Sequence, residues 1–268
     1  GRCQDECPAH AAGKPLSPRN VVQDLAAQLP EIFSDNAPVL AGEVISEETL
    51  WSCTACSACV EVCPLGVDPL ELIVGMRRHL VGTAAVRGSA ASTLGKLGRS
   101  GNPWGLPADQ RMDWAEGLEV PTVDEQPDFD VLYWVGCAAA YDPNSRRTAR
   151  AMVRLLHAAD VRFAVLGERE RCTGESARRM GEEFVFAELA AANVAELSRH
   201  QVTRIVTHCP HCLNSLKHDY PDVGGHYEVV HHSEFLSELV DSGRLKVDRG
   251  SAERVTFHDP CYLARVNG

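Results

Sequence analysis

The stretch Cys53-Thr54-Ala55-Cys56-Ser57-Ala58-Cys59-Val60-Glu61-Val62-Cys63-Pro64 decides how the first part of this chain folds. Its spacing, C-x2-C-x2-C-x3-C-P, is typical of cysteines that hold [4Fe–4S] clusters. Three thiolates separated by two-residue gaps can surround one cluster, while the cysteine before the proline usually serves the other cluster of a pair. The stretch therefore predicts four thiolate ligands, with a zinc site as the alternative, and it implies a second cysteine run.

The start of the chain carries half of such a second run. Gly1-Arg2-Cys3-Gln4-Asp5-Glu6-Cys7-Pro8 matches the closing C-x3-C-P of the same pattern. The two earlier cysteines of a full run would fall before Gly1, so we expect the chain to be a fragment that is cut inside its first cluster motif. Cys3 and Cys7 are predicted ligands; the alternative is that they are incidental cysteines near a terminus.

The composition limits the class of protein. The chain has 268 residues, 44% of them hydrophobic, which is enough for one or two domains with real cores. Its net charge of −11 argues against nucleic acid as a partner, because binding phosphates needs basic patches. No apolar run reaches the ~18 residues of a membrane span, although a span upstream stays an alternative. The two-residue cysteine gaps are too tight for a disulfide framework.

Helix signals fill the first part of the chain, which predicts an α-helical domain over 1–81. The expected helix caps are Ser17, Ser46 and Asp68. Arg77 and Arg78 are expected on a solvated helix face. Gly, Ser and Pro become frequent over 82–127, which predicts a connector.

Strand and helix patterns alternate after residue 130, which predicts a largely parallel sheet with helices on both faces. The expected strands are 131–135, 163–166, 204–207, 227–230 and 255–257. The expected helices are 145–158, a long one from about Ser176 with Phe184 on its inward face, and 234–240.

Cysteines follow the predicted strands. Cys137 comes after the first strand, Cys209 and Cys212 after the third, Cys261 after the last, and Cys172 lies in the loop before the long helix. Ligands of open α/β sheets bind outside the carboxyl ends of the strands, so we expect Cys137, Cys172, Cys209 and Cys212 to converge there. A cluster, a zinc ion, or merely buried structural thiols would each explain them.

The order of these residues resembles the CCG cysteine-rich domain. It runs from Cys137 through Cys172-Thr173-Gly174 to Cys209-Pro210-His211-Cys212. That domain occurs in the B-type and D-type components of heterodisulfide reductase, in the glycolate oxidase iron–sulfur subunit and in the C-type component of anaerobic glycerol-3-phosphate dehydrogenase. In the D-type proteins it follows a helical two-cluster ferredoxin domain, which is the order seen here. By this resemblance Cys261 opens a second copy of the motif that is cut off after Gly268.

The resemblance implies an α+β multidomain fold. An α-helical two-cluster [4Fe–4S] ferredoxin domain over 1–81 precedes a connector over 82–127 and a three-layer α/β, Rossmann-like cysteine-rich domain over 128–268. The implied cofactor-binding residues are Cys3, Cys7, Cys53, Cys56, Cys59 and Cys63. The implied catalytic residues, which would also be metal ligands together with Cys261, are Cys137, Cys172, Cys209 and Cys212.

One residue departs from the family motif. The motif reads Cys-Cys-Gly, whereas here Thr173 stands in the second place. A hydroxyl does not bridge two irons as a thiolate does, so Thr173 argues against a noncubane cluster and against heterodisulfide cleavage. An ordinary [4Fe–4S] cluster or a zinc ion remains. His208, His211, His231 and His232 are expected beside the site, with proton delivery as the alternative role.

These observations predict an iron–sulfur oxidoreductase subunit that passes electrons through [4Fe–4S] clusters to a disulfide or quinone acceptor. The resemblance implies a flavin dehydrogenase or a membrane quinone or haem subunit as partner, and a place in the cytoplasm or at the cytoplasmic face of the membrane. One alternative is a non-catalytic electron-transfer module whose cysteine-rich domain holds a structural metal or docks partners. Another is a zinc-bound regulatory protein.

Overall fold

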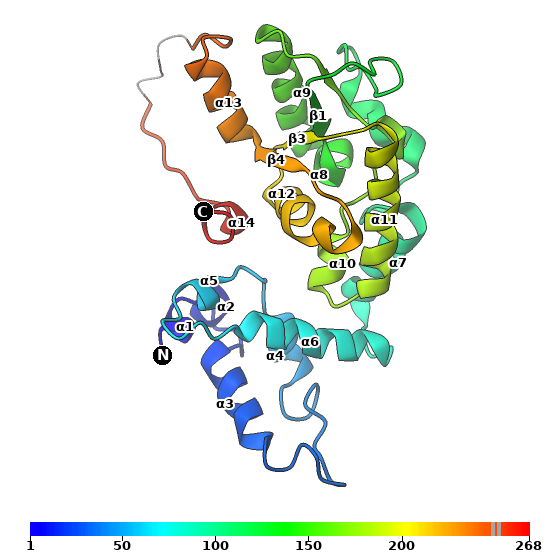
Figure 1. The fold of residues 1–268 in the computed structure, drawn as a ribbon. Coiled ribbons are helices and arrows are strands. Elements are labelled where there is room, and N and C mark those ends of the chain that lie inside the picture. The colour runs from blue at the N-terminus through cyan, green and yellow to red at the C-terminus, as the bar shows by residue number, and fades with distance from the viewer. Residues whose placement is uncertain (248–249, 251–252) are drawn as a thin grey trace. The chain divides into compact units, whose positions relative to one another are not determined.

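The computed structural model describes residues 1–247, 250 and 253–268. It divides into two compact units, each built from more than one stretch of chain (Figure 1). Unit 1 consists of Gly1–Ala90, Ser176–Glu183 and Asp259–Gly268, and unit 2 consists of Ala91–Glu175 and Phe184–His258. The described part of unit 1 is helical, whereas unit 2 contains a parallel sheet, so the chain mixes helix and strand.

Polar caps begin the longer helices of unit 1. Its helices include α1 (Arg2–Asp5), α2 (Pro8–Ala11), α3 (Pro18–Gln28), α4 (Glu47–Trp51), α5 (Ala58–Glu61), α6 (Pro69–Gly82) and α14 (Cys261–Ala264). The side chains of Ser17, Ser46 and Asp68 accept hydrogen bonds from backbone N–H groups three residues on, at 3.2, 3.2 and 3.0 Å. Such caps satisfy donors of the first helical turn, and the three predicted helix starts are confirmed.

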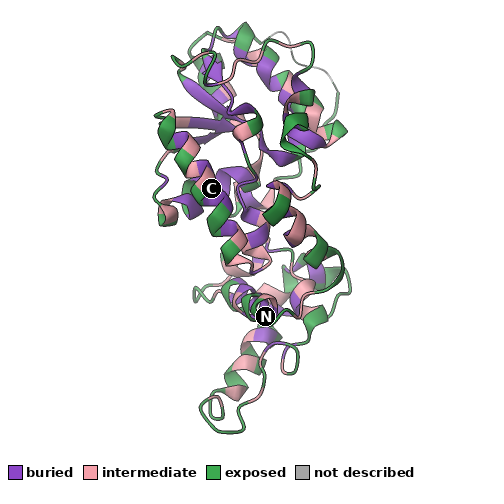
Figure 2. Ribbon diagram, turned by 90° about the vertical axis from the view of Figure 1, so that its right-hand side faces the viewer, coloured by how far each residue is buried: buried purple, intermediate pink, exposed green. Residues whose placement is uncertain are grey.

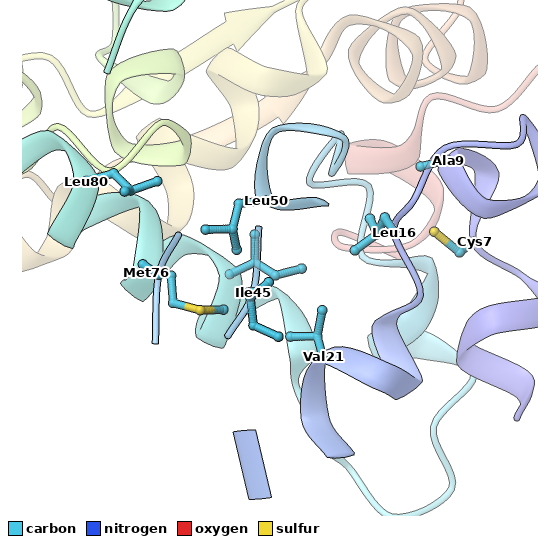
Figure 3. Close-up of a cluster of buried hydrophobic side chains, with 10 residues drawn as sticks. Cys7, Ala9, Leu16, Val21, Ile45, Leu50, Met76 and Leu80 are labelled. Atoms are coloured by element: carbon cyan, nitrogen blue, oxygen red, sulfur yellow. The ribbon is translucent and has the colours of Figure 1, made fainter. Parts of the chain in front are cut away.

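An apolar cluster holds α3, α4 and α6 together (Figure 3). Its buried members include Leu16, Val21, Ile45, Leu50, Met76 and Leu80. Cys7 belongs to the same cluster and lies next to Leu16 (Figure 3). The first cysteine run therefore rests on the packed core of the unit.

The segment Ser176–Glu183 packs on α6 within unit 1. Gly181 has φ +88°, and a Cβ added there would lie 2.5 Å from the backbone nitrogen of Arg78. Only glycine allows two backbones to approach this closely. Arg77 also donates a hydrogen bond of 2.9 Å to the carbonyl of Arg179. A stretch from late in the sequence thus completes the helical unit.

Unit 2 is built on a four-stranded parallel sheet of order β2-β1-β3-β4. The strands are β1 (Val131–Trp134), β2 (Phe163–Ala164), β3 (Arg204–Thr207) and β4 (Glu228–His231). All of β1 is buried, and Figure 2 shows the strands as the buried layer of the unit. The chain passes from β1 to its neighbour β2 and then to β3 on the other side of β1. The strand order therefore reverses between β1 and β3, where open parallel sheets bind ligands.

Helical segments follow each strand. They are α8 (Gly136–Tyr141), α9 (Pro143–Ala158), η2 (Gly167–Arg169), α10 (Glu175–Arg179), α11 (Glu183–Arg199), α12 (Pro210–Asn214), the π-helical η3 (Ser215–Asp219), η4 (Tyr220–Val223) and α13 (His232–Asp241). Two further segments, α7 (Gly88–Ser100) and η1 (Ala108–Ala115), precede β1. Across the described ranges, none of the helices is both long enough and apolar enough to cross a membrane.

Two expectations about these elements are wrong. Residues 255–257 form no strand, and Val255 and Phe257 are exposed because no neighbouring strand covers them. The long helix expected from Ser176 is interrupted after α10, and α11 restarts its helical phase at Glu183. As a result Phe184 is 88% exposed, whereas Asn193 is buried.

Candidate functional site

Four cysteines of unit 1 face one cavity. Cys7, Cys53, Cys56 and Cys59 line one hollow that is partly open to solvent. Burial is the main reason why the pKa of the Cys59 thiol rises to about 12, and the charges of Cys53 and Cys56 raise it further. Thiols of this kind ionise when a metal cation binds them. The set is therefore suited to a cationic iron–sulfur group and poorly suited to free thiolates.

The loop that carries three of these cysteines is curved by its backbone. Ala55 and Ser57, between the ligands, have φ of +55° and +59°. The N–H of Ala55 donates to the sulfur of Cys53 at 3.4 Å. Left-handed conformations at non-glycine residues cost energy and cluster at ligand sites. The four sulfurs, the shared cavity and the N–H donor together fit a [4Fe–4S] cluster.

Cys63 lies apart from that set. It lines a more open hollow with Arg2, Glu6 and Glu61, and its sulfur accepts a 3.3 Å hydrogen bond from the N–H of Val67. Cys3 lies on α1, which packs against α5. The separation matches the idea that the cysteine before the proline serves a second cluster, to which Cys3 would also contribute.

Arg77 is buried beside the first cysteine set, so the expectation of a solvated face is wrong for it. Its guanidinium donates to the carbonyls of Leu50 and Cys53 at 2.6 and 2.7 Å. It also lies 5.0 Å from the ring centroid of Trp51. Because burial disfavours its charge, its pKa is lowered. The sequence offered no sign of this role, since the partners are 24 and 27 residues away.

The structure brings together the four cysteines expected at the sheet edge. The thiols form two hydrogen-bonded pairs, Cys137 with Cys172 and Cys209 with Cys212. The charges of Cys172 and Cys137 also raise the pKa of Cys212, so the two pairs lie close to one another. No three His, Cys, Asp or Glu side chains in the described ranges form a closed set for a single metal ion. The thiols thus lie as two neighbouring pairs.

In each pair the hydrogen bond between the two thiols lowers the pKa of one and raises the pKa of the other. The pKa of Cys209 falls to about 6, chiefly because Cys212 donates to its sulfur, and the pKa of Cys212 rises well above its usual value for the same reason. Cys137 and Cys172 show the same division: the hydrogen bond lowers the pKa of Cys137 and raises that of Cys172. Within each pair, therefore, the hydrogen bond favours the thiolate form of one cysteine, Cys137 or Cys209.

The loop after β1 leaves room for these sulfurs because of Gly136. Its φ is +77°, and a Cβ at this position would lie 3.3 Å from the sulfur of Cys212. The backbone after β1 and the sulfur carried after β3 are thus in close contact, at the point where the strand order reverses.

A buried ion pair lies behind Cys137. Arg111 on η1 pairs with Glu170, and its Nη1 and Nη2 lie 3.7 and 3.9 Å from the sulfur of Cys137. Glu170 also accepts hydrogen bonds from the N–H groups of Val135 and Gly136 at 3.1 and 2.8 Å. Burial opposes the charge of Arg111, but Glu170 and Cys137 outweigh it and raise its pKa. Sequence reasoning missed both residues, because no local pattern marks them.

Histidines cluster at the ends of β3 and β4. The Tyr133 hydroxyl and His208 Nδ1 lie 2.8 Å apart, and His232 Nδ1 lies 3.2 Å from His231 Nε2. Burial, followed by the charges of neighbouring histidines, lowers the pKa of His208 and His232 to about 4. These rings are therefore neutral at pH 7. His211 instead lies 3.2 Å from Glu175, which joins the second and third cysteine loops.

Two further residues from the sequence motif take distinct places. Cys261 begins α14 and groups with unit 1, and the strand expected to precede it is absent. Thr173 is buried next to Cys172, and its carbonyl accepts a 3.3 Å hydrogen bond from Tyr220. At the second place of the motif, therefore, the chain offers a hydroxyl in the core and no thiol.

Comparisons with known proteins match separate families to the two cysteine-bearing parts of the chain. A family model described as "4Fe-4S dicluster domain" matches residues 1–67, and one described as "Cysteine-rich domain", the CCG family, matches residues 131–217. The chain is 30% identical to the D-type component of a heterodisulfide reductase from Methanosarcina barkeri, over all of this chain and 68% of that protein. The chain belongs to the iron–sulfur family that includes this D-type component. Its cofactors are [4Fe–4S] clusters.

Other relatives of this iron–sulfur protein are longer. It is 40% identical to a "Probable membrane-anchored ferredoxin" of Chromohalobacter salexigens and 35% identical to an "EtfAB:quinone oxidoreductase" of Syntrophomonas wolfei. Both matches cover all of this chain but 44% and 42% of the relatives, so the chain spans less than half of their length. No solved structure matches the chain significantly.

Proposed function

We propose that this iron–sulfur protein passes electrons from a two-cluster ferredoxin domain to a redox centre at the sheet edge, where an acceptor is reduced. The proposed domains are 1–81, a connector over 82–127, and a Rossmann-like cysteine-rich domain over 128–268. The observation that carries the proposal is the meeting of four thiols from three loops at the reversal of strand order. Such a reversal is the usual ligand site of open α/β sheets.

The cysteines divide among the proposed centres. Cys7, Cys53, Cys56 and Cys59 would hold one ferredoxin-type cluster, as their shared cavity suggests. Cys3 and Cys63 would serve the second. A [4Fe–4S] cluster, when bound, takes up or releases one electron at a time.

The remaining residues hold and tune these sulfurs. N–H donors at Ala55 and Val67 point at Cys53 and Cys63, and hydrogen bonds of this kind stabilise negative charge on sulfur. Arg77 fixes the backbone at Cys53.

At the sheet edge Cys137, Cys172, Cys209 and Cys212 would hold the terminal centre, whereas Cys261, the proposed ligand from the second motif copy, belongs to unit 1. The close pairing of these four sulfurs at the sheet edge supports an iron–sulfur cluster that all four would bind. Zinc is the alternative that four thiolates can bind, but it would carry no electrons, and no three such side chains of the described residues are placed to hold a single metal ion.

The names of two relatives support a choice of acceptor and of partner. One is named as an EtfAB:quinone oxidoreductase and another as a membrane-anchored ferredoxin. We therefore favour a quinone acceptor and a flavoprotein or a membrane quinone or haem component as partner, at the cytoplasmic face of a membrane. Thr173 supports quinone over disulfide, because the chain lacks the second adjacent thiol at that place.

The test uses the anaerobically purified protein. Cys56→Ser and Cys212→Ser are each expected to remove the iron of one centre and its EPR signal. The exposed Ser92→Ala is the control and should keep both. Iron content that is unchanged in Cys56→Ser contradicts the ligand assignment in unit 1, and unchanged iron in Cys212→Ser contradicts the terminal centre.

A second function is favoured by the same Thr173. Without an adjacent thiol pair, the cysteine-rich domain could hold a centre that only relays electrons to a partner. Reoxidation of the reduced protein separates the two functions. A rate that rises with the concentration of a soluble quinone, without partner subunits, supports the oxidoreductase. No response to either a quinone or a disulfide supports the relay module.

A further inference from the structure

The sulfur of Cys137 has a fixed cation as its neighbour. Both terminal nitrogens of Arg111 lie within 3.9 Å of this sulfur, and the Arg111 side chain is 3% exposed. A guanidinium keeps its charge in protein interiors. Little water is available to screen it, so its field acts on the sulfur at close range.

Glu170 locks this guanidinium in place. One carboxylate oxygen pairs with Arg111 and accepts from Gly136 N–H, and the other accepts from Val135 N–H. The carboxylate therefore ties η1 to the end of β1, directly before Cys137. The guanidinium also lies 5.7 Å from the ring centroid of Tyr141. Contacts on several sides leave Arg111 one orientation, with its nitrogens toward the sulfur.

We propose that Arg111 is a positioning residue that acts through Cys137 and raises the reduction potential of the centre at the sheet edge, while Glu170 holds it there and partly offsets its charge. This inference rests on the proposed function, since it needs a redox centre at Cys137. Reduction adds one electron to that centre, and no bond forms or breaks. A positive charge near the added electron stabilises the reduced form, and a negative charge destabilises it.

The two residues should therefore shift the potential in opposite directions. Arg111→Gln is expected to lower the midpoint potential, and Glu170→Gln to raise it. Each change should alter the one-electron reduction equilibrium at least tenfold, which corresponds to about 59 mV. Arg111→Lys keeps the charge and should recover most of the wild-type value. The double variant Arg111→Gln/Glu170→Gln leaves no unpaired buried charge and should fall between the two single variants.

Arg150→Gln is the matched control. Arg150 donates hydrogen bonds to the carbonyls of Trp114 and Glu116 at 2.7 and 2.8 Å. Loss of the Arg150 guanidinium thus disturbs the end of η1 but leaves the charges beside Cys137 in place. The midpoint potential of Arg150→Gln should equal that of the wild type.

The measurement is a redox titration of the full chain, followed by EPR, with iron content measured in parallel. Opposite shifts in the single variants, with recovery in Arg111→Lys, support the inference. Equal potentials, or shifts of the same sign in Arg111→Gln and Glu170→Gln, overturn it while the proposed function stands. If Cys137→Ser has the same EPR signals as the wild type, the protein has no redox centre at the sheet edge. That result overturns both the inference and the proposed function.

Discussion

Arg77 holds the carbonyl of Cys53 through a hydrogen bond of 2.7 Å from its buried guanidinium. The same side chain binds the carbonyls of Leu50 and Arg179. One charged group thus joins the start of the cysteine loop to α4 and to the segment Ser176–Glu183.

Replacing Arg77 should be costly. Arg77→Met leaves three carbonyls without their donor, of which the one at Leu50 makes a buried hydrogen bond. An unsatisfied buried group costs about 1–3 kcal/mol, so we expect a loss of about 2 kcal/mol or more in the free energy of unfolding, together with a lower iron content. Arg78→Gln, which removes only an exposed ion pair with Glu183, should cost less than about 1 kcal/mol. Urea unfolding of both variants checks this, and equal losses would contradict the assigned role.

Gly136→Ala tests the contact between the loop after β1 and the sulfur of Cys212. Left-handed backbone at a non-glycine residue costs about 1 kcal/mol or more, and the new Cβ would also press on that sulfur. Gly224→Ala is the control, because its φ is +84° but no atom lies within 4 Å of the added Cβ. Gly136→Ala should lose more stability and should disturb the EPR signal of the centre at the sheet edge, whereas Gly224→Ala should leave the signal unchanged.

Stability should fall in mild acid. His232 has a pKa near 4 in the folded protein, first because it is buried and then because of His231, against about 6.5 in an unfolded chain. Between these values the unfolded state binds more protons, so this contribution to stability is complete above pH 6.5 and is lost as the pH falls toward 4. Urea midpoints at pH 7 and pH 5 should differ less in His232→Gln than in the wild type. Replacing the exposed His226 by Gln should leave the difference unchanged.

Asn193 should prove essential to the Cys172 loop. Its Oδ1 accepts from Arg171 N–H at 3.0 Å, and its Nδ2 donates to Cys172 O at 3.1 Å and to the Tyr220 hydroxyl at 2.9 Å. Asn193→Leu leaves these buried groups unpaired and should cost about 2–4 kcal/mol. Glu188→Ala, at an exposed position of the same helix, should stay within about 0.5 kcal/mol. If both variants unfold at the same urea concentration, the loop does not depend on Asn193.

Local signals in the sequence were enough for much of the fold. The caps Ser17, Ser46 and Asp68 start helices as expected, and β3 has the predicted bounds. The meeting of Cys137 with the cysteines of two later loops also followed from the position of most of these cysteines just after predicted strands. Short-range chemistry and the geometry of parallel sheets carry these predictions.

Features that depend on distant partners could not be found this way. Asn193 lies in the core, although the apolar pattern of its helix predicts only apolar residues there. It is tolerated because its amide forms hydrogen bonds with groups 21 to 27 residues away. Arg111 lies in a stretch expected to be a connector, and its carboxylate partner is 59 residues distant. Residues 255–257 have the composition of a strand, but a strand forms only where another strand offers its backbone.

The discontinuous make-up of unit 1 has a practical consequence for anyone who wishes to study its clusters in isolation. A gene truncated after residue 90 would encode the ferredoxin-type cysteines without Ser176–Glu183 and Asp259–Gly268. Such a peptide would expose the backbone of α6 at Arg77 and Arg78, where Gly181 packs, and Arg77 would lose one acceptor. Dissecting this molecule therefore calls for internal deletions or a grafted linker, since a single cut divides one folding unit.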